Sequence, residues 1–311
     1  MAATRKLHDD EPDIDEALVR GLVDGQFPRW AGQPLKPVDS HGTSNVLFRL
    51  GDEHVVRLPR RAGAVPDLAA ERRWMPLLAA ASPVAVPEPV AEGRPDLGYP
   101  WPWAVHRWVP GAIPVVGRLE QPEALAGDLA VFVTALRGVD TTGAPRSYRG
   151  APLRERDVET REVIGRLGEA IGTDTDIGIG TCVDIDTDAA LAVWDAAVRA
   201  PRREPDVWLH ADLQPGNLLV EDGRLAAVID FECMGLGDPA VDLIVAWYVL
   251  DAPERRIFRD AVGQDPDLWA RGRGWALAIA AAELDYYRVS NPFMARTARR
   301  VIGEVLAEPA A

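Results

Sequence analysis

Three oxygen-bearing side chains in the second half of the chain have types and spacing suited to phosphate chemistry. Asp212 is followed five residues later by Asn217, and Asp230 comes thirteen residues after Asn217. Two carboxylates and an amide oxygen are hard groups that suit Mg²⁺ or a hydroxyl proton, whereas zinc would require His or Cys. The pattern therefore indicates a magnesium site beside a group that can orient a hydroxyl.

A predicted hairpin between Asn217 and Asp230 explains how distant residues could act together. Its strands are 218–220 and 225–229, and they are joined by an Asp-Gly corner. Because the two ends of a hairpin are adjacent, we expect Asp212, Asn217 and Asp230 to converge.

Three linked motifs carry a resemblance to a known family. Residues 210–217 read His-Ala-Asp-Leu-Gln-Pro-Gly-Asn, residues 230–232 read Asp-Phe-Glu, and residues 237–243 read Gly-Asp-Pro-Ala-Val-Asp-Leu. In order and spacing they resemble the catalytic loop and metal motif of protein-kinase-like folds. The aminoglycoside phosphotransferase family is the better match, with its His-Gly-Asp-Leu-His-Pro-Gly-Asn loop. The resemblance implies transfer of a phosphoryl group from ATP or GTP to a hydroxyl of a small molecule, with an aminoglycoside-like antibiotic favoured.

The resemblance also implies a role for each residue of these motifs. Asp212 would orient the acceptor hydroxyl and take its proton, while Asn217 and Asp230 would bind Mg²⁺ that bridges the nucleotide phosphates. Structural support of the catalytic loop would come from His210, Asp238 and Asp242.

Nucleotide-binding residues are implied in the N-terminal third. Arg57 stands where the family places a phosphate-binding Lys, and Glu71 in the next helix is its expected partner. An Arg keeps the positive charge and can hold phosphate oxygens in a bidentate fork. Further contacts are expected from a glycine-poor loop and from main-chain groups of the hinge, namely Thr43, Ser44 and Asn45, and Arg107 and Val109.

Acceptor binding is expected from the helical part of the chain. Candidates are Glu232, Glu283, Asp285 and Tyr286. Their carboxylates would meet ammonium groups if the acceptor is a cationic aminoglycoside. On a helix such carboxylates more commonly form a solvated surface, and macrolides or other small hydroxyl metabolites are alternative acceptors.

The elements that must position these residues fall into two groups. Strands are expected at 44–50, 54–58 and 103–109 and a helix at 67–81, whereas the chain beyond residue 122 is mostly helical in pattern. The fold class that follows from the resemblance is α+β, a two-lobed protein-kinase-like fold. Residues 1–109 would form a small nucleotide-binding lobe with an antiparallel sheet and one helix, and residues 110–311 a larger helical lobe. The hinge would lie at about 104–111. The expected helices of the second lobe are 123–137, 154–171, 188–200, 240–250, 253–262, 267–289 and 292–308.

Composition narrows the class of protein further. The 48 Asp and Glu outnumber the 34 Lys and Arg, and the net charge of −14 disfavours nucleic acid as a partner. Cys182 and Cys233 are the only cysteines, which excludes a disulfide framework. No signal peptide or membrane span is apparent, so we expect a cytoplasmic protein.

Two alternative interpretations were weighed. An inactive kinase-like binding protein would fit Arg57 and the glycine-poor loop, but the intact set of Asp212, Asn217 and Asp230 disfavours it. A protein kinase is disfavoured by the motif at 237–243 and by the lack of an Ala-Pro-Glu segment.

Overall fold

The computed structural model describes residues 6, 11–38, 44–169 and 185–309, and the chain divides into two compact units. The first unit comprises Met1–Ile113, Gly216–Glu221 and Ala226–Glu232, and the second comprises Pro114–Pro215, Asp222–Leu225 and Cys233–Ala311. The motif that contains Asp212 therefore begins in the second unit and ends in the first, at Asn217.

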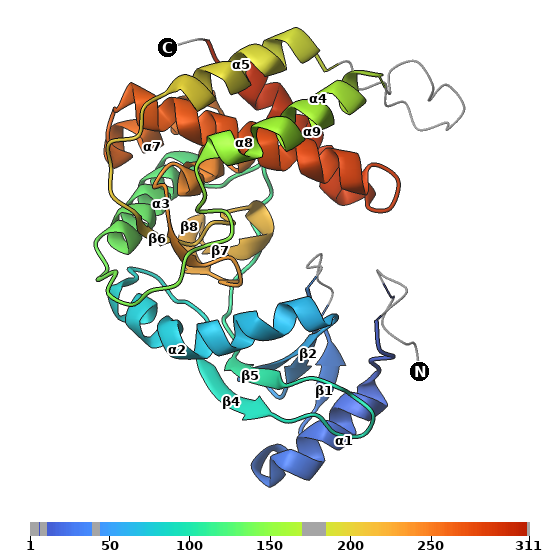
Figure 1. Ribbon diagram of the computed structural model, residues 1–311. Coiled ribbons are helices and arrows are strands. Elements are labelled where there is room, and N and C mark those ends of the chain that lie inside the picture. Colours follow the sequence, from blue (N-terminus) through green and yellow to red (C-terminus); the bar gives the residue numbers. More distant parts are fainter. Residues whose placement is uncertain (1–5, 7–10, 39–43, 170–184, 310–311) are drawn as a thin grey trace. The chain divides into compact units, whose positions relative to one another are not determined.

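A five-stranded antiparallel sheet forms the centre of the first unit (Figure 1), in the order β1-β2-β3-β5-β4. Its strands are β1 (Leu35–Pro37), β2 (Asn45–Leu50), β3 (His54–Pro59), β4 (Pro89–Gly93) and β5 (Trp103–Arg107). The register places Arg57 of β3 opposite Leu47 of β2 and Ala104 of β5. Because directly opposite residues share a face of the sheet, these three side chains lie on one face.

Helix α1 (Glu16–Gln26) covers the other face of this sheet. Asp15 begins the helix, since its carboxylate accepts a hydrogen bond from Leu18 N at 2.8 Å. Neighbouring residues of a strand point to opposite faces, so Val56 is buried in the core while Arg57 points away from it. The sequence interpretation did not include this helix. The buried cluster beneath it contains Val19, Leu22, Phe48, Val56 and Trp103.

Helix α2 (Val65–Ala81) carries Glu71 and confirms the helix predicted at 67–81, with a start two residues earlier. The second hairpin is also present, as β7 (Leu218–Glu221) and β8 (Arg224–Val228). Its corner residues Asp222 and Gly223 have φ values of 49° and 74°, which an Asp-Gly pair adopts readily.

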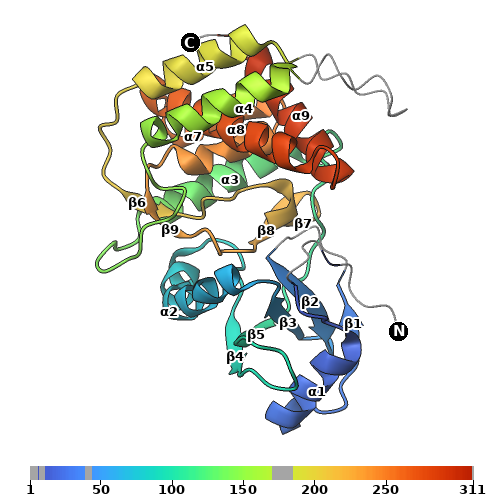
Figure 2. The same ribbon diagram turned by 45° about the vertical axis from the view of Figure 1, so that its right-hand side comes forward.

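The second unit is mainly helical, and α8 packs against α4, α5 and α9 (Figure 2). Its helices are α3 (Pro122–Arg137), α4 (Asp157–Glu169), α5 (Thr187–Arg199), α6 (Val245–Tyr248), α7 (Ala252–Val262), α8 (Pro266–Tyr287) and α9 (Pro292–Ala307). Two short strands, β6 (Val207–Leu209) and β9 (Gly235–Gly237), pair antiparallel within it. The predicted α+β class is confirmed. None of the helices among the described residues is both long and apolar enough to cross a membrane.

The segment predicted as one helix at 240–250 differs from that prediction. A 3₁₀ turn (Val241–Ile244) comes first, and α6 has only four residues. Close packing explains part of the irregularity, because a Cβ atom on Gly272 of α8 would lie 2.8 Å from Leu243 Cβ. The turn places the Asp242 carboxylate against the backbone that follows β6.

Candidate active site

Arg57 of β3 is the centre of a buried ionic cluster in the first unit. Its Nη1 donates to both carboxylate oxygens of Glu71, at 3.0 and 2.8 Å, and only 1% of Glu71 is exposed. This is the partner expected from the sequence. Because Nη1 alone contacts both Glu71 oxygens, Nη2 is left for other partners.

Asp230 and Glu232 lie at the Nη2 side of the same guanidinium. Arg57 Nη2 is 2.9 Å from Glu232 Oε1 and 3.6 Å from Asp230 Oδ1. Glu232 also accepts a hydrogen bond from the Asn45 side chain. Burial, together with the Asp230 carboxylate, raises the pKa of Glu232 to about 8. These contacts favour a nucleotide-side role for Glu232 over the predicted contact with the acceptor.

The two predicted metal ligands lie at the adjacent ends of the second hairpin. Ile229 N donates to the Asn217 carbonyl at 2.9 Å, which holds the two chain segments together. Asp230 adopts a left-handed φ of 64°, and its Oδ1 is buried without a hydrogen-bond partner. Among the described residues, no cluster of three or more His, Cys, Asp or Glu is arranged to hold a metal. An unsatisfied carboxylate oxygen beside an amide fits Mg²⁺, which takes few protein ligands and completes its shell with water and phosphate oxygens.

An apolar strip lies on the sheet face that carries Arg57. Leu47 and Val55 are half-buried there, and Ala104 is buried beside them. His106 stands opposite Val55 on the same face, and burial lowers its pKa well below the usual range, so its ring is neutral. This face can hold a flat apolar group next to a cation.

The hinge and loop residues predicted to bind nucleotide are only partly available for that role. The Arg107 amide already donates to the Glu88 carbonyl at 2.9 Å, and the Arg107 side chain pairs with Glu88. Val109 follows in an irregular segment. Ser44 is half-buried and Asn45 opens β2, whereas Thr43 lies outside the described residues.

Asp242 fixes the start of the predicted catalytic loop in the second unit. Its two carboxylate oxygens accept hydrogen bonds from His210 N at 3.0 Å and Ala211 N at 2.7 Å. The His210 ring accepts from Asp212 N at 3.2 Å. Ala211 has a φ of 65°, a left-handed conformation that favours glycine, and the family's motif has Gly at this position.

Asp212 contacts two residues that the sequence did not indicate, and one of them links it to the acceptor candidate Glu283. Arg149, from the segment between α3 and α4, donates to Asp212 Oδ1, and Gln214 Nε2 donates to the same oxygen at 3.1 Å. Gln214 also donates to Glu283 at 2.5 Å, and Tyr248 donates to the other Glu283 oxygen at 2.8 Å. Burial, with the nearby Asp212 carboxylate, raises the pKa of Glu283 to about 7.

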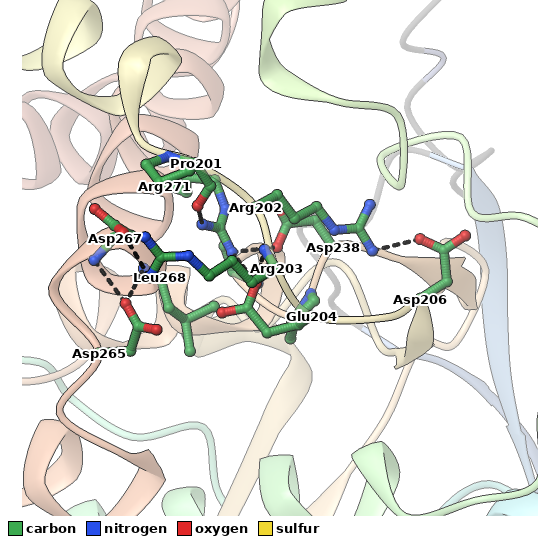
Figure 3. Close-up of polar contacts among 12 residues, drawn as sticks. Pro201, Arg202, Arg203, Glu204, Asp206, Asp238, Asp265, Asp267, Leu268 and Arg271 are labelled. Atoms are coloured by element: carbon green, nitrogen blue, oxygen red, sulfur yellow. Dashed lines mark hydrogen bonds and ion pairs between the residues drawn. The ribbon is translucent and has the colours of Figure 1, made fainter.

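Asp238 belongs to the buried ionic cluster of Figure 3 and has a structural position. Its Oδ1 accepts from Ala240 N at 3.0 Å, and its Oδ2 accepts from Arg271 Nε at 2.8 Å. Arg271 also pairs with Glu204 at 2.7 Å. These bonds tie the Gly-Asp-Pro motif to α8, in keeping with its predicted supporting role.

The other acceptor candidates lie near the end of α8. Asp285 pairs with Arg166 of α4 at 2.7 Å, and Tyr286 is 62% exposed. Arg166 occupies one Asp285 oxygen, so an ammonium group would compete with this surface pair.

Solved structures with the same fold include proteins named aminoglycoside phosphotransferases and a macrolide 2'-phosphotransferase. They include the GDP and kanamycin complex of APH(2")-IIia, at 19% identity over 93% of this chain and 98% of that chain, with a TM-score of 0.69. The ADP-bound aminoglycoside phosphotransferase APH(2'')-Ib matches at 15% identity over 94% and 97%, with a TM-score of 0.60. The macrolide 2'-phosphotransferase MphH from Brachybacterium faecium matches at 21% identity over 94% and 99%, with a TM-score of 0.58. At these identities the likeness shows the fold, which is the one predicted.

The family assignment comes from the sequence itself. No curated protein matches the chain. The family model described as "Phosphotransferase enzyme family" matches residues 36–275, well over half of the chain. The predicted enzyme class is thereby confirmed, and the chain belongs to the phosphotransferase enzyme family.

Proposed function

We propose that this protein transfers the terminal phosphoryl group of ATP or GTP to a hydroxyl of a small molecule, with an aminoglycoside-like antibiotic as the favoured acceptor. The observation that carries the proposal is the buried Arg57, held by Glu71 and next to the unsatisfied Asp230 carboxylate. A cation fixed on one side and a metal-binding oxygen beside it are what a nucleotide's phosphates require.

The first unit supplies the nucleotide side of the reaction. Arg57 would hold phosphate oxygens, and the strip formed by Leu47, Val55 and Ala104 would carry the flat base. Asn217 and Asp230 would hold Mg²⁺, which neutralises phosphate charge when it is bound. Glu232 must give up its bond to Arg57 if a phosphate oxygen is to take its place.

The second unit supplies the acceptor side. Asp212 would accept a hydrogen bond from the acceptor hydroxyl and aim its oxygen at the terminal phosphorus. As the new P–O bond forms, the bond from phosphorus to the bridging oxygen breaks and its electron pair leaves with the nucleoside diphosphate. The hydroxyl proton passes to the Asp212 carboxylate. Catalysis rests on positioning and charge, because the transition state of phosphoryl transfer is loose.

The favoured acceptor follows from charge. Glu283 is linked to Asp212 through Gln214, and Asp285 is on the same helix as Glu283, so the acceptor side carries carboxylates that favour a cationic acceptor. The kanamycin complex of APH(2")-IIia concerns such a substrate in a protein of the same fold. A macrolide is the second candidate, since MphH also has this fold.

Release of ADP or GDP in the presence of Mg²⁺ tests the proposal directly. Kanamycin, gentamicin, streptomycin and a macrolide would each be offered with ATP and with GTP, and phosphorylated product would be identified by mass spectrometry. We expect at least one aminoglycoside to gain a phosphoryl group, and the Asp212→Ala variant to form none. If no hydroxyl compound is phosphorylated while ATP or GTP still binds, the chain is a binding protein and the proposal fails.

A further inference from the structure

Arg149 is a nearly buried cation of the second unit, in the irregular segment between α3 and α4. Its side chain is 16% exposed. The Nη1 group donates to Asp212 Oδ1 and also to the Ala211 carbonyl, at 2.8 Å. The Arg149 Nη1 group therefore links the Asp212 carboxylate to the backbone carbonyl of the preceding residue, Ala211.

The backbone around Arg149 is locked in place by close contacts with β9. Ser147 N donates to the Leu236 carbonyl at 3.1 Å, and Ser147 Oγ donates to the Cys233 carbonyl at 2.7 Å. A Cβ atom on Gly150 would lie 2.3 Å from the Leu236 carbonyl oxygen, and one on Gly237 would lie 2.4 Å from Gly150 Cα. Only glycine permits this approach, so the position of Arg149 is set by the fold rather than by its side chain alone.

The loop that Arg149 contacts contains a strained backbone conformation at Ala211. Ala211 is held in the left-handed region, which costs a non-glycine residue roughly 1 kcal/mol or more. Asp242 holds the amide of Ala211, and Arg149 holds its carbonyl. Holding the amide and the carbonyl of this one strained residue fixes the two peptide planes that flank it, and with them the direction in which the next side chain, Asp212, leaves the backbone.

We propose that Arg149 is a positioning residue for phosphoryl transfer, which acts by holding the Asp212 carboxylate in the orientation that receives the acceptor hydroxyl. This inference rests on the proposed function, because it assumes that Asp212 is the catalytic carboxylate. It adds a cation that belongs to none of the three motifs. A misplacement of a catalytic group by about 1 Å can cost about 100-fold in rate, which sets the expected effect.

The test is a double-mutant cycle between Arg149 and Asp212 that uses phosphate release from MgATP and MgGTP with water as acceptor. Arg149→Met keeps the apolar stem of the side chain but removes its charge and donors. We expect it to lower kcat by about 100-fold with little change in the nucleotide KM. In an Asp212→Asn background the same substitution should cost less than about threefold, because the group that Arg149 positions is already disabled.

Two further variants separate positioning from a general structural role. Arg149→Lys keeps a cationic donor and should retain more activity than Arg149→Met. Arg146→Ala is the matched control, since Arg146 lies in the same segment but pairs with Asp206 while 62% of its side chain is exposed. It should leave kcat within about twofold of wild type.

The outcomes distinguish this inference from the function it rests on. A wild-type rate in Asp212→Asn would overturn the role of Asp212 and with it the proposed mechanism. If Asp212→Asn is impaired but Arg149→Met has the wild-type rate, the inference about Arg149 is wrong and the proposed function stands. If Arg149→Met lowers kcat by the same factor in the wild-type and Asp212→Asn backgrounds, the inference about Arg149 is also wrong. That result would mean that the substitution disturbs the fold and does not act through Asp212.

Discussion

Arg57 and Arg149 are both buried cations beside a carboxylate with a predicted role in phosphoryl transfer, Asp230 as a metal ligand and Asp212 as the catalytic group, but their surroundings differ. Arg57 contacts the carboxylates of Glu71, Asp230 and Glu232. Arg149 contacts the single carboxylate of Asp212 and a peptide carbonyl. The first cation is shared among an excess of negative charge, whereas the second has one ionic partner.

This difference indicates which of the two cations can exchange a partner for a ligand. A cation that is surrounded by three carboxylates can exchange one of them for a phosphate oxygen without losing its anchor on Glu71. A cation with one ionic partner that also holds the backbone cannot leave without disordering the loop. We therefore expect Arg57 to change partners when nucleotide binds and Arg149 to keep the same partners throughout the reaction.

The largest expected effect tests whether nucleotide binding and phosphoryl transfer depend on different units of the chain. Asp212→Asn should lower kcat by about 10²–10⁴-fold and leave the dissociation constant of the magnesium nucleotide nearly unchanged. Asp230→Ala, the matched variant in the first unit, should abolish the thermal stabilisation that MgATP or MgGTP gives. Calorimetric titration with each nucleotide would show whether the two effects separate. Weakened binding in Asp212→Asn would contradict the comparison.

A second prediction concerns pH and the carboxylate linked to Asp212 through Gln214. The pKa of Glu283 is about 7 in the folded chain, above the usual value of about 4.3 for an unfolded one. Between these values the folded chain binds more protons than the unfolded chain, so stability falls as pH rises through this window and the full penalty is present above pH 7. Glu283→Gln should remove on the order of 2 kcal/mol of this pH dependence.

Urea unfolding of both chains at pH 5 and pH 8 would measure the effect. The wild-type chain should lose more stability between the two pH values than the Gln variant. Parallel pH dependence in the two chains would show that Glu283 ionises as an ordinary surface carboxylate.

A third, smaller effect is expected from the crowded Arg57 cluster. Above pH 8, where Glu232 is ionised, Glu232→Gln removes one negative charge beside Arg57 and retains the size of the side chain. MgATP or MgGTP should bind about tenfold more tightly, because the triphosphate no longer competes with that charge. Asp285→Asn in the second unit is the control and should not change nucleotide affinity. Weaker binding in Glu232→Gln would mean that the carboxylate assists the nucleotide instead of competing with it.

The smallest expected effect is a change in folding stability, and it concerns Ala211 in the loop that Arg149 contacts. Ala211→Gly should stabilise the fold by about 0.5–1 kcal/mol, since relief of the left-handed strain outweighs the added entropy of glycine. Differential scanning calorimetry would record a small rise in Tm. A fall in Tm would show that the bonds from Asp242 and Arg149 already remove the strain.

The feature that the sequence predicted best is the hairpin that separates two of the motifs. Asp212, Asn217 and Asp230 have fixed spacing around a hairpin, and the hairpin and its Asp-Gly corner are present. The pairing of Arg57 with Glu71 was implied by the family resemblance and is present in the structure. Local spacing was enough for the hairpin because its contacts span two adjacent elements.

Other features depend on contacts that leave no local pattern. Arg149 is a single Arg in an irregular segment, and only the packing of that segment against β9 brings it to Asp212. Helix α1 has the local signals of a helix, since Asp15 is a good N-cap and Val19, Leu22 and Val23 have helical spacing, but its packing against the sheet leaves no pattern in the sequence. The type of helix after residue 240 is set by tertiary contacts of Asp242 and Leu243, which outweigh its propensity.

The close approach of the 147–150 segment to β9 has a practical consequence for engineering the acceptor range. Gly150, Gly235 and Gly237 leave no room for a side chain, so random substitution at these positions would mostly yield insoluble protein rather than new selectivity. By contrast, Tyr286 near the end of α8 and Val289 in the turn that follows are exposed, at 62% and 80%. A library that holds the three glycines constant and diversifies that helix end would explore new substrates from a stable starting point.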